Sequence, residues 1–137
     1  MYGPQLAAEL ERVALALYSA AAEHAESVGL ILADTKFEFG LLPAPATGAD
    51  GSASPAPTHG QLILIDEVLT PDSSRYWSKA AYAPGGPQES FDKQFVRDWL
   101  TANGKKAVEG VRLPDDIVDK TVGRYREAFE RVTGQTL

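Results

Sequence analysis

Residues 30–39 read Leu-Ile-Leu-Ala-Asp-Thr-Lys-Phe-Glu-Phe, and the interpretation of the chain starts from them. If the run is one strand, its side chains alternate between two faces. Asp34, Lys36 and Glu38 then share one face. The other face carries Thr35, Phe37 and Phe39. Three charges on an otherwise apolar strand are costly unless something compensates them. The charged face therefore either lines a cleft for a metal ion and an anionic ligand, or faces solvent as in many antiparallel sheets.

The composition is that of a single globular domain. The 137 residues are 44% hydrophobic and 23% charged, which is enough to bury a core. No apolar run approaches the roughly 20 residues of a membrane span, and the N-terminus lacks the pattern of a secretory signal. The chain has no cysteine, which excludes disulfides and thiolate metal sites. We therefore expect a cytoplasmic protein that does not enter a membrane.

The charge and histidine content narrow the range of partners. A net charge of −6 without a basic run argues against a nucleic-acid partner. Two histidines, His24 and His59, are too few for a histidine-rich metal site. Any metal would be held by oxygen atoms, which favours Mg²⁺.

The first segment, residues 4–27, is predicted to be a long helix. Its apolar face follows a 4-3-4 spacing through Leu6, Leu10, Val13 and Leu17. Gly29 suits the left-handed position just after the helix. His24 lies near the apolar face, and we expect it to be packed or half-exposed rather than a ligand.

Two strands should follow this helix and pair with each other. The apolar run at residues 61–68 ends in two carboxylates and is predicted to form an antiparallel hairpin with residues 30–39. The connection between them, through Gly60, is rich in Pro, Ala, Gly and Ser and is predicted to be a flexible loop in which His59 has no specific role. This pairing would bring the acidic end of the second strand near the charged part of the first.

The C-terminal part is predicted to be mainly helical. Residues 70–77 begin with turn chemistry at Pro71 and Asp72. Ser90 is expected to cap a helix that runs to about Ala102. A last helix over residues 114–132 has apolar side chains spaced 4-3-4-3, with a stop at Gly134.

Three groups of side chains are suited to phosphate chemistry. Glu38 and Asp66 come from adjacent strands and are positioned to converge on one Mg²⁺, with Lys36 beside them. The alternative is an ordinary Lys–Glu pair on an exposed strand. Arg75 follows two serines in a turn, which makes a phosphate receptor, although the same combination is common in loops. Lys93 and Arg97, predicted in the first turns of a helix, suggest an anionic ligand unless Asp92 neutralises them.

Four segments occur in an order that resembles one enzyme family. They are Asp-Thr-Lys-Phe-Glu-Phe-Gly (34–40), Leu-Ile-Asp-Glu-Val (64–68), Thr-Pro-Asp-Ser-Ser-Arg-Tyr-Trp (70–77) and Ser-Phe-Asp-Lys-Gln-Phe-Val-Arg (90–97). The series closely resembles phosphoribosylaminoimidazole-succinocarboxamide synthase, or SAICAR synthetase, of purine biosynthesis. The resemblance covers nearly the whole chain, residues 6–134. It implies an ATP-dependent ligase that joins L-aspartate to the carboxylate of carboxyaminoimidazole ribonucleotide (CAIR) and releases SAICAR, ADP and phosphate.

The resemblance also implies a role for each candidate residue. Glu38 and Asp66 would be the acids for Mg²⁺ and the ATP phosphates. Lys36 would face the phosphates or the CAIR carboxylate, with Asp34 orienting it. Substrate contacts form two groups: Ser74 and Arg75 at the 5′-phosphate of CAIR, and Lys93, Gln94 and Arg97 at the imidazole substrate or the incoming aspartate.

In domain terms the resemblance implies an α+β, SAICAR synthetase-like C-terminal half. Residues 1–78 would form a long helix plus an antiparallel strand pair of a larger sheet, and residues 79–137 the mainly helical part. The loop at residues 41–60 is longer than the family leads one to expect. The N-terminal ATP-binding lobe would be absent, so that half of the enzyme is an expected partner and little turnover is expected without it. An exposed sheet edge would also permit homo-oligomers.

Two other interpretations stay open at this point. The chain could be a non-catalytic α+β interaction module that retains the fold, with its charged strand facing solvent. It could also be a kinase-like fragment that binds magnesium and nucleotide, although the cations around Arg75 and Arg97 suggest a second anionic substrate. The convergence of Lys36, Glu38 and Asp66 separates the ligase from the module.

Overall fold

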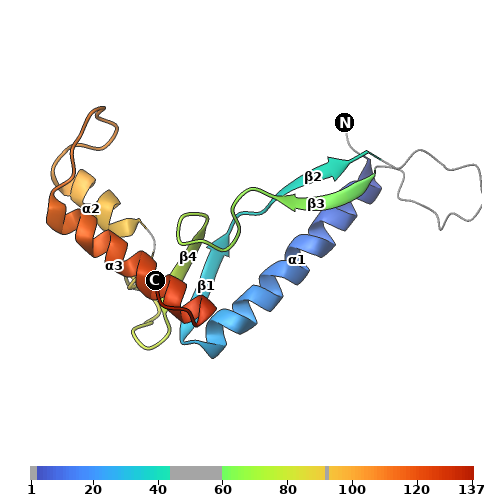
Figure 1. Ribbon diagram of the computed structural model, residues 1–137, viewed down its shortest axis with the longest axis horizontal. Helices are drawn as coiled ribbons and strands as arrows, with labels where there is room; N and C mark the ends of the chain where they lie inside the picture. Colours follow the sequence, from blue (N-terminus) through green and yellow to red (C-terminus); the bar gives the residue numbers. More distant parts are fainter. Residues whose placement is uncertain (1–2, 44–59, 92) are drawn as a thin grey trace, which may run out of the picture.

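A long helix, two antiparallel strand pairs and two further helices make up the part of the chain that the structure describes (Figure 1). This computed structural model describes residues 3–43, 60–91 and 93–137. The elements in order are α1 (Pro4–Ser27), β1 (Leu30–Thr35), β2 (Glu38–Leu42), β3 (Gln61–Ile65), β4 (Ser74–Ser78), α2 (Gln94–Ala102) and α3 (Asp115–Thr133). The α+β class predicted from the sequence is confirmed.

The predicted strand at residues 30–39 is divided in two, so the expectation of a single strand was wrong. β1 pairs with β4 and β2 pairs with β3, both antiparallel. The predicted hairpin therefore holds only for its outer part, from Glu38 opposite Ile65 to Leu42 opposite Gln61. The division arises because β3 and the chain leading into β4 compete to pair with this stretch. The backbone N–H of Lys36 donates to Ser73 O at 3.2 Å and not to a residue of β3.

The α1 bounds agree with the predicted helix at residues 4–27, and Gly29 takes the expected left-handed φ of 78°. His24 is exposed, and its Nε2–H donates to Val132 O at 2.7 Å. This bond ties the end of α1 to the end of α3. Figure 1 accordingly shows the two helices as arms that converge at their C-terminal ends beside β1 and β4.

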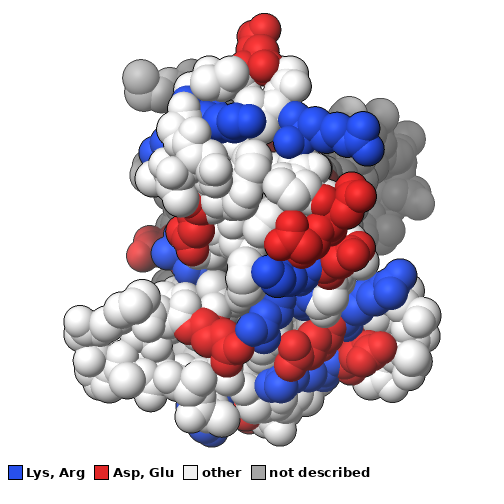
Figure 2. All heavy atoms as spheres, turned by 90° about the vertical axis from the view of Figure 1, so that its left-hand side faces the viewer, with Lys and Arg blue, Asp and Glu red and all other residues white. Residues whose placement is uncertain are grey.

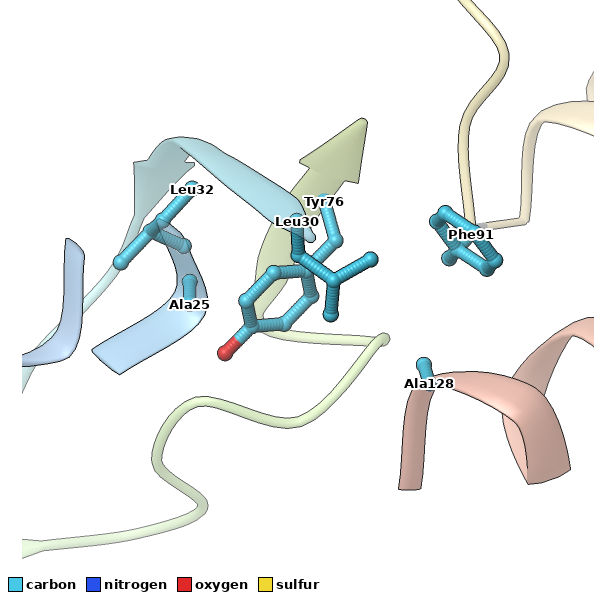
Figure 3. Packing of buried hydrophobic residues seen from close by; sticks show 6 residues of the cluster. All are labelled: Ala25, Leu30, Leu32, Tyr76, Phe91 and Ala128. Carbon is cyan, nitrogen blue, oxygen red and sulfur yellow. The ribbon is translucent and has the colours of Figure 1, made fainter. Parts of the chain in front are cut away.

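The core lies where these elements meet. Six buried residues form it, as Figure 3 shows: Ala25, Leu30, Leu32, Tyr76, Phe91 and Ala128. Phe91 joins the helical part to the strands, because the guanidinium groups of Arg124 and Arg131 each lie 5.3 Å from its ring. Glu127 accepts hydrogen bonds from both arginines and holds them in place. Cation–π contacts of this kind add to apolar burial.

The start of α2 differs from the prediction. Ser90 does not cap the helix; it forms an isolated bridge with Trp77, and its hydroxyl donates to Tyr76 O at 3.4 Å. The Ser90 hydroxyl, which was expected to cap α2, is therefore hydrogen-bonded to β4. The helix begins at Gln94, with Lys93 as the residue before it.

The last helix is close to its prediction, and Gly134 ends it with a φ of 68°. Most of the predicted loop at residues 41–60, including His59, lies outside the described residues. Among the helices that the structure describes, none is both long enough and apolar enough to cross a membrane.

Leu30→Ala should lower the free energy of unfolding by about 2–5 kcal/mol, because Leu30 is 0% exposed and its truncation leaves a cavity. Urea denaturation followed by circular dichroism measures the change. Leu15→Ala is the matched control, since Leu15 is 59% exposed and its loss should cost less than about 0.5 kcal/mol. Equal losses in the two variants would contradict the location of the core.

Candidate functional site: a cationic cavity beside a carboxylate pair

A cavity of about 180 Å³ opens between the end of β1, the turn before β4 and the start of α2. Its lining is polar and consists of Asp34, Thr35, Lys36, Asp72, Ser73, Ser74, Arg75, Lys93 and Arg97. Six of the nine residues singled out from the sequence therefore meet around one space. They are Asp34, Lys36, Ser74, Arg75, Lys93 and Arg97.

The cavity attracts anions although the whole chain is acidic. Four cationic side chains and two carboxylates line it, which leaves two net positive charges in a chain of net charge −6. Guanidinium, ammonium and hydroxyl donors together are the usual partners of a phosphate group. By contrast, Figure 2 shows basic and acidic side chains interspersed over the face that α2 and α3 present. The mixed charge of that face contrasts with the net positive lining of the cavity.

The β1–β4 register builds one wall of the cavity. It places Asp34 opposite Arg75 and Thr35 opposite Ser74. The Asp34 Oδ1 and Arg75 Nε atoms are 3.5 Å apart, and the Thr35 and Ser74 hydroxyls are 2.8 Å apart. The ionic contact of Asp34 is thus with Arg75, and its expected role of orienting Lys36 stays a prediction.

The turn before β4 builds the second wall. Thr70 Oγ1 accepts hydrogen bonds from the backbone N–H groups of Asp72 and Ser73 at 3.3 and 3.1 Å. Ser74 N–H donates to Thr70 O at 2.9 Å. The turn chemistry predicted from Pro71 and Asp72 is confirmed, and these bonds orient the serines toward the cavity.

Asp72 and Lys93 connect this turn to α2. The Lys93 Nζ and Asp72 Oδ1 atoms are 2.6 Å apart. The hydrogen bond from Lys93, followed by its charge, lowers the pKa of Asp72 below the ordinary value of 3.8. Lys93 is thereby held over the cavity by a carboxylate, and an incoming anion would compete with that carboxylate for it.

A carboxylate pair lies beside the cavity and shares Lys36 with it. Lys36 Nζ is 2.5 Å from Glu38 Oε1 and 3.6 Å from Asp66 Oδ2. The hydrogen bond to Glu38 is the main cause of the raised pKa of Lys36. Asp66 follows directly after β3 and has a left-handed φ of 64°, a conformation that aspartate tolerates better than most residues. The predicted convergence of Lys36, Glu38 and Asp66 is therefore present.

These two carboxylates suit Mg²⁺ in their chemistry. Both are oxygen donors that already hold a positive charge between them, and magnesium commonly takes one or two carboxylates with water and phosphate oxygens. In the described ranges, no group of three or more His, Cys, Asp or Glu side chains gathers to hold a metal without such help. A magnesium ion here would need ligands from water or a bound phosphate.

Gln94, like Glu38 and Asp66, does not line the cavity. As the first residue of α2, it donates through its amide to Asp98 Oδ1 at 2.7 Å. Three lining residues are outside the nine that were singled out: Thr35, Asp72 and Ser73, the first of the two serines before Arg75. The Thr35 side chain would have been found only with the β1–β4 register, since alternation placed it on the face opposite the charges. Asp72 had a sequence signal, its position in a turn before two serines, but its partner Lys93 is 21 residues away.

Comparisons with known proteins identify the family. A family model described as SAICAR synthetase matches residues 1–114. The phosphoribosylaminoimidazole-succinocarboxamide synthase of Candida albicans is 48% identical over 97% of this chain and 40% of its own length. A solved structure of SAICAR synthase from Saccharomyces cerevisiae complexed with SAICAR superposes with a TM-score of 0.81 at 45% identity, over 98% of this chain and 40% of that one.

A more distant structure, a SAICAR synthetase in complex with ADP, shares 22% identity over 98% of this chain and 41% of that one. Its TM-score of 0.60 shows the fold alone. The chain belongs to the SAICAR synthetase family. It spans about two fifths of the length of the curated relatives that it matches.

The Lys93–Asp72 contact should contribute to stability in a pH-dependent way. Because the folded-state pKa of Asp72 lies below 3.8, the contact stabilises the folded chain above that pH and is lost as the pH falls through the folded-state pKa. The free energy of unfolding of the wild type should exceed that of Lys93→Met at pH 7, and the difference should vanish well below pH 3.8. Urea denaturation at a series of pH values measures it.

Asp72→Asn provides the control for this experiment. It deletes the titrating group, so adding Lys93→Met to it should change the free energy of unfolding equally at all these pH values. A wild-type difference that is the same at acid and neutral pH would contradict the pairing.

Proposed function

We propose that this chain is the magnesium- and substrate-binding part of an ATP-dependent ligase that joins L-aspartate to the carboxylate of CAIR, giving SAICAR, ADP and phosphate in purine biosynthesis. Membership of the SAICAR synthetase family supports the reaction. The observation that carries the proposal is the cationic cavity next to two carboxylates that converge on Lys36. The lack of cysteine suits a reducing cytoplasm, where we place the reaction.

The chemistry of amide formation explains why such a site needs both features. A carboxylate is a poor electrophile toward an amine, so it must first gain a leaving group, which a phosphoryl group from ATP supplies. The triphosphate and the second anionic substrate then have to be held together against their mutual repulsion. A cavity with two net positive charges beside an acidic metal-binding edge meets this requirement.

Each described side chain has a role in this proposal. Arg75 and Ser74 bind the 5′-phosphate of CAIR, with Asp34 fixing the Arg75 guanidinium. Lys36 stands between the cavity and the carboxylate pair, which suits it to neutralise the phosphoryl group or the CAIR carboxylate. Lys93 and Arg97 bind the imidazole substrate or aspartate from the α2 side, together with Gln94 at the edge.

Mg²⁺ would be held by Glu38 and Asp66, and would supply positive charge to the phosphates of ATP. Lys36 forms ion pairs with both carboxylates, so its ammonium group would be repelled by a metal bound there, toward the cavity that Lys36 also lines. The ammonium group of Lys36 would thus become available to the substrate when Mg²⁺ replaces it at the two carboxylates.

The domain organisation follows from the same reasoning. Residues 1–78, with the loop 41–60, carry the carboxylate pair and the phosphate receptor, and residues 79–137 contribute the helical wall of the cavity. The binding of adenine and most of ATP falls to the N-terminal lobe of the family enzyme, which is the expected partner of this chain.

Arg75→Met should weaken the binding of ribose 5-phosphate about 10- to 100-fold, because a charge-assisted hydrogen bond to phosphate is lost. A titration followed by NMR chemical shifts gives the Kd. Lys79→Met is the matched control: it also removes one positive charge, but Lys79 pairs with Glu26 at 2.8 Å and lies outside the cavity lining. Equal effects of the two substitutions, or a wild type that does not bind the probe, would favour the non-catalytic module.

The second expectation concerns turnover. With ATP, Mg²⁺, CAIR and L-aspartate, this chain alone should release little or no ADP in a coupled assay. Addition of the separately produced N-terminal half of a family enzyme should restore SAICAR formation, and Glu38→Gln should reduce it strongly. Rapid turnover by this chain alone would contradict the division of labour. Folded halves that associate but form no product would contradict the ligase itself.

A further inference from the structure

The segment between β3 and β4, residues 66–73, links the two parts of the site. It begins at Asp66, one of the paired carboxylates, and ends at Ser73 in the cavity wall. In its middle, Leu69 has a φ of 58°. This left-handed conformation is unfavourable for a leucine, so other contacts must maintain it.

Leu69 is partly buried and packs against the core cluster, but the space on its α3 side is not completely filled. A mainly apolar cavity of about 230 Å³ is lined by Leu69 and Pro71 of this segment and by Phe129 and Val132 of α3. Apolar contacts have no preferred direction, so a hydrogen bond is needed to fix the orientation of the peptide planes here.

Tyr76 provides such a bond. Its ring is 2% exposed and packs in the core, and its hydroxyl donates to Leu69 O at 2.9 Å. The backbone carbonyl of Tyr76 accepts a hydrogen bond from the Phe91 N–H at 2.9 Å. Both the backbone and the side chain of Tyr76 are therefore hydrogen-bonded. Burial raises the pKa of the Tyr76 hydroxyl, which keeps it protonated as a donor. Arg75, its neighbour on β4, lines the cationic cavity.

We propose that Tyr76 is a positioning residue that holds Leu69 in its left-handed conformation and so sets the distance between the carboxylate pair and the phosphate receptor. Without the hydroxyl, Leu69 relaxes toward negative φ and the peptide planes after it turn. The Thr70 carbonyl and hydroxyl, which hold Ser73 and Ser74, then lose their orientation. The ligand-binding consequence rests on the proposed function, whereas the conformational consequence does not.

Tyr76→Phe tests this proposal, since it removes one oxygen atom and keeps the buried ring. In this chain it should raise the Kd for ribose 5-phosphate about 2- to 10-fold, the range that one hydrogen bond covers. It should also speed amide hydrogen exchange at Ser74, whose N–H donates to Thr70 O. Both effects are measured by NMR.

Tyr18→Phe is the matched control. The Tyr18 hydroxyl makes the same kind of bond, to Leu32 O at 2.8 Å, but its acceptor lies in β1 and not in residues 66–73. Its loss should lower the stability to a similar degree, but leave the phosphate affinity and the Ser74 exchange relative to global unfolding unchanged.

The double variant Tyr76→Phe with Leu69→Asn supplies the rescue. Asparagine adopts the left-handed conformation more readily than leucine, so the substitution should recover at least half of the lost protection and affinity. A purely structural role for Tyr76 would give no recovery.

The outcomes separate the two proposals. Normal Ser74 exchange in Tyr76→Phe, or equal effects of Tyr18→Phe, would overturn the positioning role. A wild type that does not bind ribose 5-phosphate would overturn the phosphate receptor. The exchange measurements on the three variants would still decide the positioning role in that case.

Discussion

The antiparallel pairing of β1 with β4 is the constraint on which the rest of the structure depends. It joins residues 39 to 48 positions apart in the sequence and gives the strand pair different surroundings along its length. Leu30, Leu32 and Tyr76 enter the core, whereas Asp34 and Arg75 meet at the cavity. Because the same ladder holds both, the burial of apolar side chains fixes the position of the charged ones.

The division of residues 30–42 into two strands explains how one short stretch serves two sites. Up to Thr35 the chain follows β4 and builds the phosphate-receptor side. From Glu38 it follows β3 and carries one of the paired carboxylates. Lys36 lies at the change of partner, and its ammonium group contacts the carboxylates while lining the cavity. The switch between ladders therefore places the Lys36 ammonium group between the cationic cavity and the carboxylate pair.

Local patterns in the sequence predicted the helices well and the strand partners poorly. The α1 bounds followed from apolar spacing and Gly29, both of which depend only on neighbouring residues. The break after Thr35 has no glycine, proline or other turn signal, because it is caused by competition between β3 and β4. The start of α2 was misplaced for a similar reason: Ser90 is a good capping residue locally, yet its hydroxyl donates to Tyr76 O of the neighbouring strand β4. The predicted site residues came together because most belong to short motifs, while Thr35 and Asp72 depend on long-range pairing.

The same limit applies to α3. Its apolar spacing through Val118 and Val122 predicted a helix, yet both residues are 41% exposed, and the buried positions are Ile117 and Ala128. Periodicity indicates that a helix has an apolar face, but the partner that covers this face belongs to the tertiary structure. In the described ranges, α3 contacts α2, and its Arg124 packs over the ring of Phe91.

The β2–β3 ribbon gives the molecule a graded resistance to unfolding. β1 and β4 each contain buried residues, whereas every residue of β2 and β3 is at least partly accessible to solvent. A two-stranded ribbon of this kind opens at a lower free energy than the core strands. Glu38 belongs to that ribbon and Asp66 follows directly after it, while Arg75 and Ser74 belong to the rigid pair. The acidic half of the site therefore lies on the strand pair that opens more readily, and the phosphate receptor on the pair that resists unfolding longer.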